Sequence, residues 1–149
     1  MDPNHYRFRG VWRLPAPPAA VYAALEDVRS YPLWWPEIRT ARETGPGRGE
    51  VVARALLPYR LVIGLETVRC DPAAGVLEAA MHGDLTGWSR WTVAPDGAGS
   101  HVLFEEDTRP AKPLLRRLAL PLHPVFRANH AAMMWRGRRG LAEYLTANG

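Results

Sequence analysis

The chain has 149 residues, of which 47% are hydrophobic and 23% charged, with a formal net charge of +4. This length favours one domain over residues 1–149 with its own core, and the composition is that of a soluble globular protein. Cys70 is the only cysteine, which excludes an internal disulfide and a cysteine-based metal cluster. No apolar run approaches the roughly 20 residues that span a bilayer, and the first ten residues are unlike a signal peptide. We therefore expect a cytoplasmic protein without a membrane span.

The positive charge is compatible with an anionic partner, but most arginines are scattered along the chain. Two basic clusters stand out, at residues 116–117 and 136–139. Neither alternates with aromatic residues in the manner of proteins that bind single-stranded nucleic acid, so no nucleic-acid partner is expected. The five histidines lack the close spacing of a metal site. The sequence therefore predicts neither a metal nor a cofactor.

The chain opens with alternating apolar and basic residues. Tyr6, Phe8 and Trp12 share one parity within residues 6–14, and arginines hold the other. This alternation predicts a half-buried strand. Gly10 lies in the middle of the segment, where a glycine indicates a bend or a bulge.

Two short helices are predicted after this strand. Pro18 suits the first turn of a helix that continues over residues 19–27. Asp27 is placed to cap a second short helix over residues 28–32. The segment LWWPEI at 33–38 then sets two tryptophans between prolines, which makes it a stiff and bulky apolar plug.

The next seventy residues have a strand-like pattern. Six strands are predicted, over residues 37–44, 50–57, 59–70, 76–83, 85–94 and 100–109. The connectors GPGRG, DPAAG and PDGAG are turn-like. Consecutive strands joined by short turns form an antiparallel meander, so GPGRG is interpreted as a hairpin turn and not as a phosphate-binding loop.

The last predicted element is a long amphipathic helix over residues 124–145, after an apolar, proline-interrupted lead-in at 112–124. At about 100° per residue, its apolar face includes an Asn129–His130 pair and two glycines. The polar pair departs from an ordinary core face, and the glycines leave room for a close neighbour. This face is therefore a candidate cavity wall.

One strand, two short helices, six strands and one long helix predict an α+β fold. A curved antiparallel sheet of seven strands must bury its concave face against the C-terminal helix, and curved sheets of this size often enclose a ligand cavity. The chain resembles the START-like (SRPBCC) superfamily of polyketide cyclase/dehydrase and lipid-transport proteins, which share the helix-grip fold. The resemblance rests on PAPPAAVYAALEDVRSYPLWWPEI, GDLTGWSRWTV, HVLFEED and FRANHAAMMWRGRRGL. It implies a cavity for an apolar small molecule; known members carry lipids, sterols or quinones, or cyclise or dehydrate polyketides.

Three polar residues are candidates for chemistry at that cavity. His130 would act as an acid or base on a bound carbonyl, and Asn129 would hydrogen-bond an enol or phenol oxygen. Glu106 shares parity with Val102 and Phe104, so it is a buried carboxylate if those residues face inward. The alternative is that Asn129 and His130 only fix the helix and that Glu106 lies at the rim.

The candidate ligand contacts are mostly aromatic or flexible side chains. They are Trp34, Trp35, Tyr59, Met81, Ser89, Trp91, Phe104, Phe126, Met133 and Met134. We expect Trp91 to face inward with Val93, because Arg90 is easier to place in water. Alternatively, the tryptophan pair plugs one end of the sheet and the methionines fill the core. Trp135 falls opposite the apolar face, where it is exposed or marks a homodimer contact.

The sequence leaves several functions open. The first is a carrier of an apolar small molecule, and the second is an enzyme that positions a polyketide for cyclisation or dehydration. An accessory protein that binds a partner is the third. An inward, mutually reachable set of His130, Asn129 and Glu106 would favour catalysis, whereas a wholly apolar lining would favour carriage.

Overall fold

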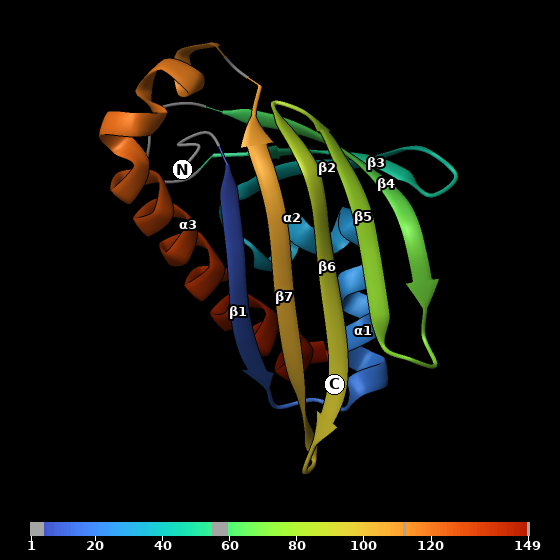
Figure 1. The fold of residues 1–149 in the computed structure, drawn as a ribbon. Coiled ribbons are helices and arrows are strands. Elements are labelled where there is room, and N and C mark those ends of the chain that lie inside the picture. Colours follow the sequence, from blue (N-terminus) through green and yellow to red (C-terminus); the bar gives the residue numbers. More distant parts are fainter. Residues whose placement is uncertain (1–4, 55–59, 112, 149) are drawn as a thin grey trace.

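The computed structural model describes residues 5–54, 60–111 and 113–148 (Figure 1). Its elements in chain order are β1 (Tyr6–Leu14), α1 (Pro18–Glu26), the 3-10 helix η1 (Val28–Ser30), α2 (Tyr31–Trp34), β2 (Ile38–Gly45), β3 (Arg48–Ala53), β4 (Leu61–Asp71), β5 (Val76–Gly83), β6 (Leu85–Asp96), β7 (Gly99–Pro110) and α3 (Pro113–Asn148). The predicted α+β fold is confirmed.

The seven strands form one antiparallel sheet in the order β1-β7-β6-β5-β4-β3-β2. The first strand pairs with the last, so β1 and β2 are the two edges. Figure 1 shows the sheet curving around α1 and α2, with α3 crossing the same side along β1. The concave face therefore meets all the helices.

The predicted strands agree with the observed ones within a few residues, and two differences are informative. The strand predicted over 50–57 begins earlier, at Arg48, and ends at Ala53; residues 55–57 lie outside the described part of the chain. The bulge predicted at Gly10 is wrong, because β1 pairs with β7 without a register shift along its whole length; the alternative, a bend, stays a prediction. The bulges occur instead in β2 and β4. The predicted hairpin turn is confirmed, with Gly47 at a φ of +67°.

The segment between α1 and β2 is more broken than predicted. The second helix is η1 followed by α2, so it extends through Trp34. Asp27 does not cap it with its side chain. Instead, the Ser30 hydroxyl donates a 2.7 Å hydrogen bond to the Asp27 carbonyl oxygen. The capping prediction failed because the Ser30 N–H, whose hydrogen bond a capping carboxylate would accept, donates to the Asp27 carbonyl oxygen at 3.0 Å instead.

The long helix starts eleven residues earlier than predicted, at Pro113. Prolines 121 and 124 lack an N–H donor and therefore suggested an interruption. A proline inside a helix can bend the helix without ending it, and Figure 1 shows the start of α3 at an angle to the remainder. Among the described helices, α3 included, none combines the length and the apolar character needed to cross a bilayer.

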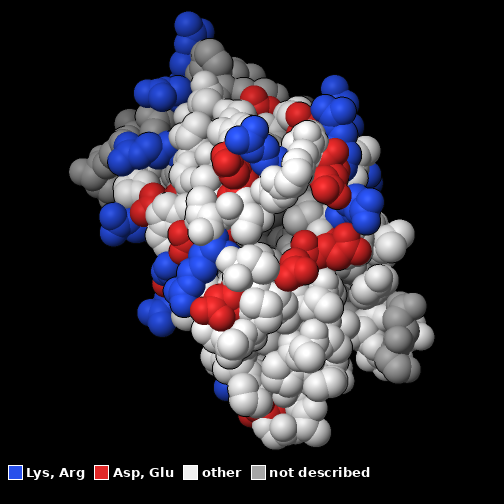
Figure 2. Space-filling model, turned by 90° about the vertical axis from the view of Figure 1, so that its right-hand side faces the viewer, with Lys and Arg blue, Asp and Glu red and all other residues white. Residues whose placement is uncertain are grey.

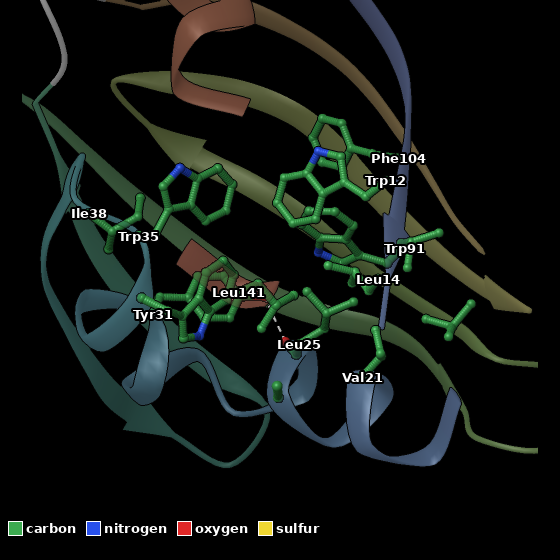
Figure 3. Packing of buried hydrophobic residues seen from close by; sticks show 14 of the residues in the cluster. Trp12, Leu14, Val21, Leu25, Tyr31, Trp35, Ile38, Trp91, Phe104 and Leu141 are labelled. Carbon is green, nitrogen blue, oxygen red and sulfur yellow. Dashed lines mark hydrogen bonds between the residues drawn. The ribbon is translucent and has the colours of Figure 1, made fainter. Parts of the chain in front are cut away.

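The core is built around a layer of tryptophans (Figure 3). Trp12 contacts three others, with ring centroids 5.0 Å from Trp91, 5.7 Å from Trp35 and 6.4 Å from Trp34. All four are at most 7% exposed. Burial of such large rings is the main apolar contribution to this core.

The layer meets α3 at its two glycines, as the thin helical face predicts. A Cβ atom at Gly137 would lie 2.7 Å from the Trp35 ring, and one at Gly140 would overlap the Trp34 carbonyl oxygen. The Trp35 indole N–H also donates a 2.9 Å hydrogen bond to the Met133 carbonyl oxygen. These contacts fix the C-terminal half of α3 against the sheet.

Candidate ligand cavity and its acid–base pair

A cavity of about 540 Å3 lies between the concave face of the sheet, the segment α1–η1 and α3. This volume lies within the range of small-molecule sites. Most of its lining is apolar and comes from the central strands, for example Val51, Ile63, Leu65, Leu77 and Met81. A ligand held there would contact mainly apolar side chains.

One end of the cavity has a charged rim. The lining residues there come from α1, η1 and the β2–β3 hairpin and include Glu26, Asp27, Arg29, Arg42, Glu43 and Arg48. Figure 2 shows a hollow on one face of the molecule with acidic and basic side chains around it. A mixed rim of this kind gives solvent access without a strong preference for the charge of a ligand.

At the other end, β7 and α3 bring a carboxylate and an imidazole together. Oε1 of Glu106 lies 3.6 Å from Nε2 of His130, and the two side chains are 9% and 15% exposed. This distance is too long for a hydrogen bond, but the two groups are within the range of an ion pair. The Thr108 hydroxyl donates a 3.0 Å hydrogen bond to the other carboxylate oxygen, which holds it in place.

His130 is also positioned by β1. Its ring stacks on Phe8, with ring centroids 3.5 Å apart and planes 8° from parallel. Its buried Nε2 atom has no hydrogen-bond partner among the described residues. The imidazole is thus held in one orientation, with its Nε2 atom turned toward Glu106.

Tyr6 adds a potential donor at the same end. It is 6% exposed, lines the cavity and stands opposite Thr108 in the β1–β7 register. Its hydroxyl is buried without a hydrogen-bond partner among the described residues. Burial raises the pKa of Tyr6, although the charge of Arg127 acts against the shift. The phenol therefore keeps its proton at neutral pH.

The structure places most of the predicted site residues on the cavity wall. Alongside Glu106 and His130 are Asn129, Trp35, Met81, Ser89, Trp91, Phe104, Phe126 and Met133. Glu106 faces inward with Phe104, and Trp91 with Val93, as their parities predict. Arg90 lies on the outer face between Glu78 and Glu105.

Two predicted ligand contacts are placed elsewhere, and a third lies outside the described residues. Trp34 lies in the tryptophan layer and does not line the cavity, because its backbone is pressed against Gly140 of α3. Met134 lines a separate groove on the outside of β1, because it is one residue, or about 100°, from Met133 around the helix. Tyr59 lies outside the described residues. Trp135 is 53% exposed, as its helical position suggests, and the homodimer stays a prediction.

Sequence reasoning missed Tyr6, Phe8 and Thr108 as site residues. Tyr6 and Phe8 share the parity of the buried Trp12, and Thr108 shares that of Glu106. The parities were visible, but a strand pattern does not show which inward positions reach an open space. A buried carboxylate at Glu37, 3% exposed, was also missed; it lies 3.7 Å from the Arg136 guanidinium.

A curved antiparallel sheet closed by a C-terminal helix over a cavity defines a helix-grip protein of the START-like kind. Residues 6–145 match the sequence model of the polyketide cyclase / dehydrase and lipid transport family, and the chain belongs to that family. The resemblance drawn from the sequence is thereby confirmed. No curated protein shows a significant sequence match to the chain.

Solved structures with the same fold share little sequence with it. A protein of Thermus thermophilus is 20% identical, with a TM-score of 0.78 over 97% of this chain and 99% of the other. A START superfamily protein from Mycobacterium smegmatis is 13% identical, with a TM-score of 0.78 over 96% and 99%. The Zhui aromatase/cyclase from a Streptomyces species, R1128, is 14% identical, with a TM-score of 0.75 over 95% and 94%. At these identities the likeness shows the fold alone.

Proposed function

We propose that the protein binds an apolar, carbonyl-bearing small molecule of polyketide type and catalyses its cyclisation or dehydration. The observation that supports this most is the His130–Glu106 pair on the wall of an otherwise apolar cavity. A carrier needs no such pair, and burying it without a function would cost stability. The family description and the aromatase/cyclase among the structural neighbours agree with the proposal.

The geometry suggests a proton cycle. Neutral His130 takes a proton from the carbon next to a ketone through Nε2, and Glu106 stabilises the resulting imidazolium. The Tyr6 hydroxyl donates a hydrogen bond to the ketone oxygen as it becomes an enolate. The enolate carbon then forms a bond to a second carbonyl of the same molecule, and the new alkoxide takes the proton back from His130. Loss of a further proton and of the hydroxyl, as water, gives the dehydrated ring.

Carriage without chemistry is the second candidate function. The apolar wall that the sheet contributes supports it, since burial of a hydrophobic ligand there requires no reactive group. A carrier would bind the same class of molecule and release it unchanged. The two functions therefore differ in turnover and not in binding.

The deciding experiment compares His130→Ala and Glu106→Gln with the wild type. A linear β-triketone serves as substrate, ring formation is followed by absorbance, and binding is followed by tryptophan fluorescence, since Trp35 and Trp91 line the cavity. Loss of the acid–base group should lower kcat by about 100-fold or more while binding changes little. His82→Ala, on the outer face of β5, is the matched control.

If the wild type binds the triketone but cyclises it no faster than His130→Ala, catalysis by this pair is refuted and carriage is supported. Thermal unfolding of each variant separates loss of activity from loss of fold. Failure of the wild type to bind any apolar probe would refute both functions.

A further inference from the structure

A second hollow lies on the outside of the molecule, between edge strand β1 and α3. It has a volume of about 570 Å3 and is lined by residues 8–12 of β1 and by a run of α3 residues from Arg127 to Arg138. Phe8, Phe104 and His130 line both this groove and the inner cavity. The Phe8–His130 stack is therefore part of the wall that separates the two spaces.

Gly10 leaves open space in the groove beside this stack. It lies between Phe8 and Trp12 on the inward face of β1, opposite Phe104 of β7. The register there is regular and its φ is not positive, so neither a bulge nor a special backbone conformation requires glycine. A Cβ atom would have no heavy atom within 4 Å, so crowding does not require it either. The close approach of a ligand is a further reason for a glycine inside a strand.

The charge of the groove around Gly10 indicates which part of a ligand would lie there. Arg9, Arg127 and Arg138 line the groove, and the Arg127 guanidinium carbon lies 5.2 Å from the centre of the Phe8 ring. None of the described residues that line the groove is Asp or Glu. Guanidinium groups bind carboxylate and phosphate oxygens with charge-assisted, often bidentate hydrogen bonds. The groove is thus complementary to an oxyanion.

We propose that this groove is a subsite for the oxyanionic end of the ligand, whose apolar part lies against Gly10, parts the Phe8–His130 stack and occupies the inner cavity. The inference rests on the proposed function and deepens it, because it defines the ligand as an apolar chain that ends in a carboxylate or a phosphate. An end group fixed outside the sheet would also set which carbon of the chain lies next to His130.

The test measures the affinity of the purified protein for three probes of equal chain length: dodecanoate, dodecyl phosphate and dodecanol, each below its micelle concentration. An oxyanion held by arginine should bind the wild type about tenfold more tightly than the alcohol, which is the effect of one charge-assisted hydrogen bond. The anion that binds more tightly identifies the end group.

Two variants locate the effect. The double variant Arg127→Gln/Arg138→Gln should lose the preference for anions and bind dodecanol as the wild type does. The control Arg54→Gln/Arg69→Gln removes the same charge elsewhere and should keep the preference for anions. Gly10→Val fills the open space in the groove with a residue that suits a strand, and because no heavy atom lies within 4 Å of the new Cβ the fold stays intact. It should likewise remove the preference for anions.

Equal affinity of the wild type for all three probes would overturn the subsite while leaving the proposed function standing. The subsite would also be overturned if the double arginine variant and Gly10→Val both kept the preference for anions. Absence of binding for every probe would refute the proposed function and the subsite together.

Discussion

The contact between α3 and α2 gives the sharpest prediction about the fold. Gly140 packs directly on the backbone of Trp34, and a methyl group there would stand closer to the Trp34 carbonyl oxygen than the 3.0 Å that real Cβ atoms keep. The Trp34 side chain is 3% exposed. Neither the carbonyl nor the ring has space to move, so in Gly140→Ala the helix must shift away from the tryptophan layer.

Two opposing effects set the size of the loss. Alanine is favoured over glycine inside a helix by about 1 kcal/mol. Overpacking of a tight core costs about 1–3 kcal/mol, and more where a rigid group must move. Because the overlap is with backbone, we place the cost at the upper limit and expect a net loss of about 2 kcal/mol. For a chain of this size that corresponds to a Tm lowered by about 4–8 °C.

The assay is thermal unfolding followed by circular dichroism, on three alanine variants of glycine. Gly137→Ala should lose less than Gly140→Ala, because its clash at 2.7 Å is with the side chain of Trp35. Gly10→Ala meets no atom within 4 Å and should be as stable as the wild type or more so. A Gly140→Ala protein with an undiminished Tm would refute the packing argument.

Two further predictions concern buried polar groups. The hydroxyl of Ser100, 1% exposed, donates a 2.6 Å hydrogen bond to the Ala16 carbonyl oxygen, so Ser100→Ala should lose about 1–3 kcal/mol; an unchanged urea midpoint would contradict this. Burial raises the pKa of Glu37 above its ordinary value of 4.5, although Arg136 acts against the shift. The folded state therefore holds this proton to higher pH than the unfolded chain, and the unfolding free energy should fall as pH rises through and above that value. In Glu37→Gln the unfolding free energy should fall less over this pH range. Parallel curves of stability against pH for the two proteins would refute the prediction.

Local sequence patterns predicted most of the fold, because each pattern depends on residues that are close together in the chain. Alternation in residues 6–14 set the inward face of β1, and the glycines of α3 marked where a neighbour comes close. The sequence did not predict the start of α3, because a proline either ends a helix or bends it, and tertiary contacts decide which of the two occurs. The Gly10 bulge was wrong because a glycine in a strand has several causes that the sequence does not distinguish.

The candidate site was harder to predict because it depends on distances between elements. Helical periodicity placed His130 on the inner face of α3, and strand parity placed Glu106 on the inner face of β7. Neither pattern contains the curvature that brings their side chains to 3.6 Å. The contribution of Phe8, which orients the imidazole, depends on the pairing of the first strand with the last, and this pairing is nonlocal.

The arrangement of α3 separates stability from binding along a single helix. Its C-terminal half is fixed by Gly137, Gly140 and the indole hydrogen bond to Met133. Its middle contacts β1 through the stack of His130 on Phe8, and the open space at Gly10 lies beside this stack. A ligand that parts this stack would leave the contacts of Gly137 and Gly140 in place, because these glycines lie about two to three helical turns further along α3. Substitutions at His130 should therefore act on binding and turnover, whereas substitutions at Gly140 act on the fold first and on the cavity through it.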